Sequence, residues 1–384
     1  MSFLYDFNLS SDEETRARRV HDEAIVIDIV NMGVGGSTLY NEPELADAAA
    51  YLPDPSNPIE VLLESMLLPY ELLAQGESSA IRRWWDESGM AATSFPLYSI
   101  NDAWIDRMAE IEHRLLQCDW LVIAKSASDI GRNKANQKHS FFYNCQPQPG
   151  WGLTTDLKQL EKAKAAGLTS LTLTYNRMDL AGVGCIERVD AGLSYLGVDI
   201  VKSCEALGMV VDVSHCGKTT TLDACRISKK PVTANHTCAE AIYSCNRAKS
   251  DEEMKAVAGT GGLIGVLAVP FFITRQNRPT IEVVLDHIDY IADLVGWQHV
   301  GIGSDWPFQA PAQLANIAFM GASKELGFRK EDNLDTTNEV KGFEDSRCMR
   351  NISRGLVKRG YEDEQIAGIL GENYMRVLAA VQTT

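Results

Sequence analysis

The sequence is short of positive charge. Its 384 residues carry 36 Lys and Arg against 52 Asp and Glu, which gives a formal net charge of −16 at pH 7. A protein that binds nucleic acid needs lysine and arginine clustered along the phosphate backbone. We therefore expect no nucleic-acid partner, and we interpret the acidic excess as a contribution to solubility.

Export and membrane signals are also missing. The start, MSFLYDFNLSSDEETRARR, lacks the basic residues and apolar run of a signal peptide. No apolar stretch approaches the ~18 residues of a membrane span. The nine cysteines include no CxxC pair, and an odd number in an unexported chain indicates free thiols in a reducing compartment. We expect a cytoplasmic protein that does not span a membrane.

Apolar runs alternate with helix-like segments along the chain. Several runs are almost continuous Val, Ile and Leu, which is typical of parallel strands covered on both faces. Eight strands alternating with helices are the number in a (β/α)8 TIM barrel, and we expect residues 1–384 to form one such domain. The predicted strands are 24–30, 90–97, 139–145, 170–175, 209–215, 231–236, 262–268 and 299–305.

The remaining segments are assigned around this barrel. We expect a helical N-terminal extension, a helical C-terminal cap, a helical insertion or lid over 38–89, and a loop over the barrel mouth at 307–345. Thr154, Lys218 and Thr280 stand where the N-caps of three amphipathic helices would lie, and glycine follows the first and third of these helices.

The histidines can be sorted by their place on the predicted strands, because barrel chemistry occurs at the carboxyl ends of strands. Two of the seven, His215 and His236, end consecutive strands, and Asp305 ends the last strand. Two imidazoles and a carboxylate on one rim form a plausible divalent-metal site. The alternative is that these three polar residues only hydrogen-bond to loops. The other histidines precede or start strands or lie in helices, which favours structural roles: His21, His113, His139, His287 and His299.

Five stretches carry a family resemblance. They are GLTSLTLTYNRMDLAGVG, GLSYLGVDIVKSCEALGMVVDVSHCGKTT, PVTANHTCAEAIYSCNRAKSD, GGLIGV and HIDYIADLVGWQHVGIGSDW. Together they resemble the renal (membrane) dipeptidase family of zinc peptidases, a branch of the amidohydrolase superfamily. The segment RGYEDEQIAGILGENYMRVL resembles the family's C-terminal helical signature. The likeness runs, with gaps, over residues 139–380.

The resemblance implies roles for individual residues. His215 and His236 match the two histidines that hold one of the family's two zinc ions, and Asp305 matches the aspartate that contacts the other metal and the attacking water. Arg247 matches the arginine that binds the substrate's terminal carboxylate, a group suited to a bidentate guanidinium. The resemblance also implies a homodimer.

The chain departs from the family at the other metal ligands. Aligning the family's first-strand aspartate with Asp28 places its His-x-Asp pair at Val30 and Met32. The bridging glutamate of the third strand is replaced by an amide, Asn144 or Gln146, and the substrate-contacting histidine by Tyr175. Three of six expected ligands remain, and two dications need more negative charge than this. We expect one metal ion at most.

The leading hypothesis is a mononuclear metal-dependent hydrolase. His215, His236 and Asp305 would hold one divalent metal, with zinc expected first and iron or manganese as alternatives. Asp305, if it is not a ligand, would act as general base, and Tyr175 would donate a hydrogen bond to the oxyanion. Arg247, Tyr175, Asn176 and Gln146 would contact a small substrate that bears a carboxylate, such as a dipeptide, an N-acyl amino acid or another small amide.

Two other hypotheses remain open. Two histidines and one carboxylate also form the triad of non-haem Fe(II) enzymes, so a lyase, decarboxylase or iron enzyme on the same scaffold is an alternative. A binding homologue without catalysis is another. Among the cysteines near strand ends, Cys145 is the better candidate for a ligand or nucleophile. Asp28 is interpreted as a buried hydrogen-bonding residue.

Overall fold

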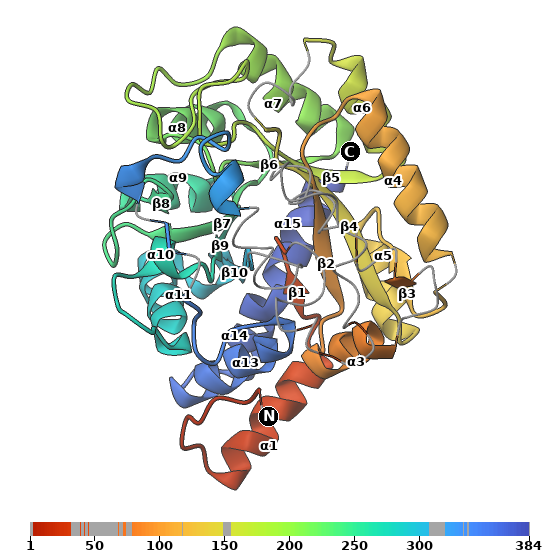
Figure 1. Cartoon of the computed structure of the whole chain (residues 1–384), viewed down its shortest axis with the longest axis vertical. Coiled ribbons are helices and arrows are strands. Elements are labelled where there is room, and N and C mark those ends of the chain that lie inside the picture. The colour runs from red at the N-terminus through yellow and green to blue at the C-terminus, as the bar shows by residue number, and fades with distance from the viewer. Residues whose placement is uncertain are drawn as a thin grey trace.

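Eight parallel strands follow one another around a barrel (Figure 1). The computed structural model describes residues 3–31, 39, 42, 45, 68, 72–73, 79–116, 118–148, 155–306, 319–332, 334–335 and 338–383. In spatial order the barrel strands are β1 (Ile27–Asp28), β2 (Ala92–Leu97), β4 (His139–Cys145), β5 (Leu168–Thr172), β6 (Val210–Asp212), β7 (Val232–Ala239), β9 (Leu263–Val266) and β10 (Val300–Ile302). The predicted (β/α)8 barrel and its eight strands are confirmed.

Backbone hydrogen bonds between the first and last strands bring the two edges of the sheet together. The amide of Ile29 donates to the carbonyl of Ile302 at 2.9 Å, and the amide of Asp305 donates to the carbonyl of Val30 at 2.8 Å. The second bond places Asp305 beside the end of β1. Residues far apart in the sequence therefore meet at the carboxyl end of the barrel.

Helices surround the strands in the βα order that the periodicity predicts. Those between strands are α3 (Ser79–Ser88), α4 (Asp102–Leu115), α5 (Ala127–Ala135), α6 (Lys158–Ala166), α7 (Tyr195–Leu207), α8 (Lys218–Ile227), α9 (Asp251–Gly259), α10 (Pro270–Ile273), α11 (Ile281–Val295) and the 3₁₀ turn η4 (Trp297–His299). The strands between this layer and the barrel interior are buried, as expected for parallel strands covered on both faces.

The three N-cap predictions had different outcomes. Thr280 is the N-cap of α11, as expected. The N-cap of α8 is Gly217, so Lys218 is the first helical residue and not the cap. Helix α6 begins at Lys158 after Leu157, whereas Thr154 lies outside the described residues. The glycines predicted to end α6 and α11 are their C-caps, Gly167 and Gly296.

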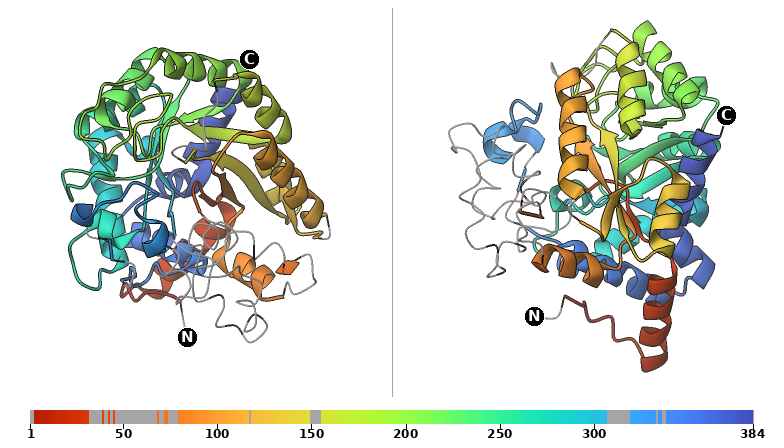
Figure 2. Two further views of the ribbon diagram at one scale, coloured as in Figure 1. Left: turned by 45° about the horizontal axis from the view of Figure 1, so that its top comes forward. Right: turned by 90° about the vertical axis from the view of Figure 1, so that its right-hand side faces the viewer.

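The two chain ends cover the amino-terminal side of the barrel. Helix α1 (Ser11–Glu23) packs on α13 (Met349–Lys358), where Glu14 pairs with Arg354 (Figure 2). Helix α15 (Asn373–Gln382) follows α14 (Asp363–Ala367) and the turn η7 (Gly368–Glu372) and runs beneath the strands. Its Tyr374 stacks on Phe142 of β4 with ring centroids 5.6 Å apart. The predicted N-terminal extension and C-terminal cap are both present.

Some segments differ from the prediction. Two short strands were not expected: β3 (Leu121–Ile123), which pairs with β4, and β8 (Ala248–Lys249), which pairs with β7. Of 38–89, the described part is mainly α3, and the rest lies outside the described residues. Of 307–345, residues 319–332, 334–335 and 338–345 are described, and they include the turn η5 (Lys330–Asp332); the turn η6 (Ser346–Cys348) follows directly. Among the described helices, none is long and apolar enough to cross a membrane.

Candidate active site

Two neighbouring strands deliver histidines to one point. His215 follows β6, and His236 lies within β7, which continues to Ala239 and ends three residues later than predicted. Their Nε2 atoms lie 2.9 Å apart, and both rings are buried. The structure thus brings together the two residues that the sequence placed on one rim.

The hydrogen bonds of Asn176 determine which nitrogen of His215 carries a proton. The side chain of Asn176 donates through Nδ2 to the carbonyl of Leu326 at 2.8 Å, so its Oδ1 faces Nδ1 of His215 at 2.7 Å. An amide oxygen only accepts hydrogen bonds, so Nδ1 of His215 carries the proton and Nε2 presents a lone pair. Asn176 adopts a left-handed backbone conformation, with φ 60°, which asparagine tolerates better than most residues.

The second histidine is less constrained. Nδ1 of His236 is buried and has no hydrogen-bond partner among the described residues. Because Nε2 of His215 presents a lone pair, Nε2 of His236 must donate the proton of the hydrogen bond between the two rings. Burial and the charge of Arg247 lower the pKa of both histidines well below the usual range, so both imidazoles are neutral, which is the form that binds metals.

Arg247 hydrogen-bonds to the backbone of both segments that carry the histidines. Its guanidinium is buried and donates to the carbonyl of Ser214, which precedes His215, and at 3.2 Å to the carbonyl of His236. Nε of Arg247 finds no partner within the described part of the chain. The arginine predicted to bind a substrate carboxylate is therefore already bonded to the protein backbone, with one buried N–H unused.

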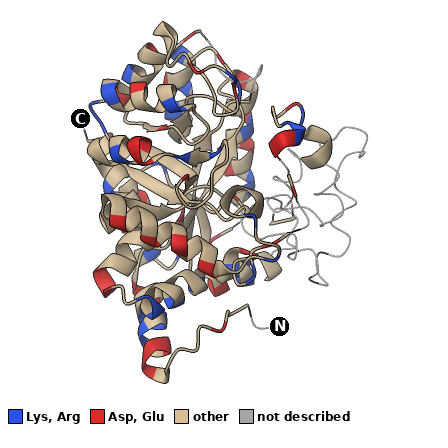
Figure 3. Cartoon of the chain, turned by 90° about the vertical axis from the view of Figure 1, so that its left-hand side faces the viewer, with Lys and Arg blue, Asp and Glu red and all other residues tan. Residues whose placement is uncertain are grey.

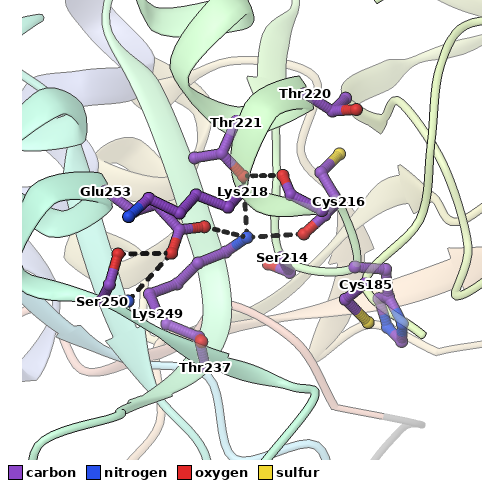
Figure 4. Close-up of polar contacts among 12 residues, drawn as sticks. Cys185, Ser214, Cys216, Lys218, Thr220, Thr221, Thr237, Lys249, Ser250 and Glu253 are labelled. Atoms are coloured by element: carbon purple, nitrogen blue, oxygen red, sulfur yellow. Dashed lines mark hydrogen bonds and ion pairs between the residues drawn. The ribbon is translucent and has the colours of Figure 1, made fainter. Parts of the chain in front are cut away.

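A second buried cation lies next to it. Nζ of Lys249 donates to the carbonyl of Cys216 at 2.7 Å and to Oγ1 of Thr221 at 2.8 Å, and it pairs with Glu253 at 3.1 Å (Figure 4). Glu253 also accepts from Ser250 and forms the capping box of α9. Arg247 and Lys249 thus fix the carbonyls on both sides of His215.

Asp305 lies in the left-handed region as well, with φ 52°, and is half-buried. Burial raises its pKa to about 7, although Arg247 acts in the opposite direction. Tyr175 stacks on His215 with ring centroids 4.0 Å apart, and burial together with Asp305 raises the pKa of its phenol, which keeps it protonated at neutral pH. The charges of Asp305 and Arg247 therefore act on the same group of side chains, which includes Tyr175 and the two histidines.

The positions where the resemblance placed the other metal ligands carry apolar or neutral side chains in this chain. Val30 is buried at the end of β1, and Met32 lies outside the described residues. Asn144 donates through Nδ2 to Ser94 at 3.1 Å, while its buried Oδ1 is unpartnered within the described structure. Gln146 is buried, with its backbone amide bonded to the carbonyl of Leu97 at 2.8 Å.

The metal-ligand set is therefore only partly assembled. Among the described residues, no group of three or more His, Cys, Asp or Glu side chains is placed to hold a metal ion. Two imidazole nitrogens converge, and one of them has its lone pair fixed toward the other. The two imidazoles suit one ion, and among the described residues no carboxylates are assembled beside them to hold a second.

Cys145 does not lie at the site. It is fully buried in the apolar cluster outside the barrel, near Cys204 of α7, and burial raises its thiol pKa far above the usual range. Residues adjacent in a strand face opposite ways, so Asn144 and Cys145 cannot both face the interior. The suggestion of a ligand or nucleophile at Cys145 is wrong.

Two buried aspartates support the strand ends, and one of them was predicted. Asp28 accepts from the amide of Ser304 at 2.9 Å and from its hydroxyl, which confirms the hydrogen-bonding interpretation. Asp212 accepts from Thr172 at 2.6 Å and from Ser214 at 2.6 Å. The sequence offered a signal for Asp212, a lone carboxylate in the apolar run MVVDVSH. It offered none for the backbone contacts of Lys249.

The whole chain can now be compared with known proteins. The profile of "Membrane dipeptidase (Peptidase family M19)" matches residues 102–319 and 331–384, which is more than half of the chain. The chain belongs to this family. The matched ranges include His215, His236, Arg247 and Asp305, whereas Leu326 and the residues of β1 and β2 lie outside them. The M19 match also implies a divalent metal, because M19 is a family of metallopeptidases.

Individual relatives are distant. Dipeptidase verJ of Clonostachys rogersoniana is 28% identical over 220 residues, which cover 56% of this chain and 49% of that protein. Dipeptidase tcpJ of Claviceps purpurea is 27% identical over 268 residues, which cover 70% and 57%. The M19 chain thus spans about half the length of the curated relatives it matches.

Solved structures share the fold over nearly the full chain. An amidohydrolase from Pseudomonas aeruginosa superposes with a TM-score of 0.72 at 23% identity and covers 95% of this chain and 99% of its own. A metallo peptidase from Rhodobacter sphaeroides, liganded with a phosphinate mimic of the dipeptide L-Ala-D-Ala, superposes with a TM-score of 0.62 at 18% identity over 81% and 96%. At these identities the likeness establishes the fold.

Proposed function

We propose that this M19 protein is a dipeptidase-like hydrolase with a single divalent metal held by His215 and His236. The observation that carries the proposal is the pair of Nε2 atoms 2.9 Å apart, one of them with its tautomer fixed by Asn176. Such an outer hydrogen bond orients a ligating histidine and favours the lone pair on the ligating nitrogen. Zinc is the first expectation, since it suits imidazole ligands.

When bound there, a divalent ion supplies Lewis-acid activation of a carbonyl and of water. Asp305 moves the proton. With a pKa near 7 it exchanges a proton readily at neutral pH, which suits a general base that later protonates a leaving amine. Because no third ligand is assembled beside the histidines in the described structure, we assign Asp305 to proton transfer in preference to metal ligation.

The substrate is a small amide with a carboxylate. The unpartnered buried N–H of Arg247 Nε favours an anionic acceptor, because a buried donor without a partner costs ~1–3 kcal/mol. Tyr175 is held as a neutral phenol and can donate to a developing oxyanion. Dipeptides and N-acyl amino acids have both features, and the ligand of the Rhodobacter sphaeroides relative suggests alanyl dipeptides as the first substrates to test.

The test combines metal analysis with activity on one preparation. Purified protein is assayed by elemental analysis and with L-Ala-D-Ala, L-Ala-L-Ala and N-acetyl-alanine. We expect about one zinc per chain and hydrolysis that is lost in His215→Ala together with the metal. Turnover by a metal-free preparation would contradict the proposal, and iron or manganese in place of zinc would redirect the search to non-hydrolytic reactions.

A further inference from the structure

A pocket lies on the carboxyl side of the barrel, between the segment that follows β5 and residues 319–334. Its volume is about 850 Å³, within the range of small-molecule sites. Four cationic side chains and one carboxylate line it: Arg177, Lys324, Arg329, Lys330 and Glu187. The lining is therefore basic, although the chain as a whole carries a net charge of −16.

Acidic and basic residues are interspersed along the ribbon in the view of Figure 3, whereas four of the five charged residues that line the pocket are basic. The segment itself also contains acids, yet Glu325, Glu331 and Asp332 do not line the cavity. Asp332 is directed elsewhere, since it accepts from the amide of Arg329 at 2.6 Å and from Asn246 at 2.9 Å. The two exposed cations Arg329 and Lys330 have no ion-pair partner among the described residues.

The wall of the pocket is built by specific contacts. Nη2 of Arg177 donates to the carbonyl of Lys324 at 2.6 Å, which joins the β5 side to the 319–332 side. Gly327 between them has φ +94°, and a Cβ there would lie 2.9 Å from the Arg177 side chain. The neighbouring Asn176 bonds both Leu326 and His215. The pocket wall is thus tied to the site through Asn176, while neither His215 nor His236 is among the residues that line the pocket.

An apolar patch completes the lining. Phe328, Met320 and Leu334 line the same cavity, and the Phe328 ring packs 6.0 Å from that of Phe272. A ligand that satisfies both parts carries an anionic group for the guanidinium and ammonium groups and an apolar group for Phe328 and Met320. Inorganic anions alone would leave the apolar surface uncovered.

We propose that this pocket binds a small amphipathic anion, an aryl or acyl compound that bears a phosphate or a carboxylate. The site is distinct from the proposed hydrolytic centre, and the inference does not depend on hydrolysis. Binding should weaken with salt, because partly exposed charges at this spacing are screened at physiological ionic strength.

The experiment is calorimetric titration at low salt with phenyl phosphate and phenylacetate as probes, and with inorganic phosphate and phenol as fragments. We expect saturable binding of at least one probe, tighter than that of either fragment. The double variant R329A/K330A should weaken it at least ~10-fold, which corresponds to two lost charge-assisted contacts. The double variant K202A/K255A is the matched control, because it removes two exposed lysines from α7 and α9, away from the pocket, and should change binding less than ~2-fold.

A His215→Ala variant distinguishes this site from the metal site. Because phosphate compounds also bind divalent metals, probe binding must persist in that variant. If neither probe binds saturably, if both double variants weaken binding equally, or if His215→Ala abolishes it, the proposal is overturned. Where binding is saturable, the relative affinities of phenyl phosphate and phenylacetate identify which anionic group the pocket prefers.

Discussion

Oδ1 of Asn176 accepts a hydrogen bond from Nδ1 of His215 at 2.7 Å, while Nδ2 of the same asparagine donates to the backbone of Leu326. This one side chain fixes the tautomer of His215 and leaves the lone pair of its Nε2 directed toward His236. It also joins the site to the segment 319–332, which no pattern in the sequence connects to His215.

Removing this acceptor should weaken metal binding. In Asn176→Ala, Nδ1 of His215 loses its partner, and we expect metal affinity to fall ~10- to 100-fold, as for other outer partners of ligating histidines. Competition with a chromophoric chelator measures the affinity. Asn176→Asp is the control, because its carboxylate still accepts from Nδ1 and tolerates the positive φ. Equal losses in both variants would show that the bond to Leu326, and not the tautomer, is what matters.

Asp305 should control the pH dependence of activity. Since its pKa lies near 7, the fraction of the basic carboxylate falls about tenfold per pH unit below that value. We expect kcat/KM to rise with pH and level off above about 7. Asp305→Asn should lower kcat ~100-fold or more at unchanged metal content.

Metal analysis of the same variant separates two roles. If Asp305→Asn retains its metal and loses turnover, Asp305 is a proton carrier. If it loses the metal, Asp305 is a ligand, and the assignment made above is wrong. The positive φ of Asp305 makes asparagine the suitable replacement, because asparagine accepts this backbone conformation.

The buried Lys249–Glu253 pair should show strong coupling. Lys249→Met leaves a buried glutamate without its cation, and Glu253→Gln leaves a buried lysine without its anion, so each is expected to cost ~3–5 kcal/mol of unfolding free energy. The double variant should recover much of this loss, because no unpaired charge remains. Urea unfolding of the three variants measures the coupling energy, and additive losses would contradict it.

The fold could be predicted because its signal repeats along the chain. Each of the eight barrel strands is a local apolar run, and β4 has the same limits, His139–Cys145, in the prediction and in the structure. The short strands β3 and β8 were missed because two or three residues give no periodicity. The strand β7 was predicted to end three residues early because His236 was taken as its end.

The site was less accessible to sequence reasoning. His215 and His236 could be paired because strand ends of a barrel converge, a rule that needs no side-chain detail. The partners of Arg247 could not be foreseen, since donation to the carbonyls of Ser214 and His236 leaves no trace in residue identity. The alternation of side chains along a strand would have placed Cys145 on the opposite face from Asn144, and so away from the site.

Asp28 should make the protein less stable as pH rises. Burial raises its folded-state pKa to about 7, above the unfolded value of about 3.8. Between these values the unfolded chain ionises Asp28 while the folded chain keeps it protonated, so unfolding releases a proton. The contribution of this group to the free energy of unfolding therefore falls by up to ~1.4 kcal/mol per pH unit in that window, and is constant below and above it.

Asp28→Asn should remove this slope while it keeps an acceptor for the amide of Ser304. Urea unfolding at pH 5, 6, 7 and 8 measures the difference between variant and wild type, which should shift in favour of the variant up to pH 7 and then stay level. The exposed Asp199→Asn on α7 is the control and should give a flat difference. A flat difference for Asp28→Asn as well would mean that the carboxylate is ionised throughout, held by Ser304 alone.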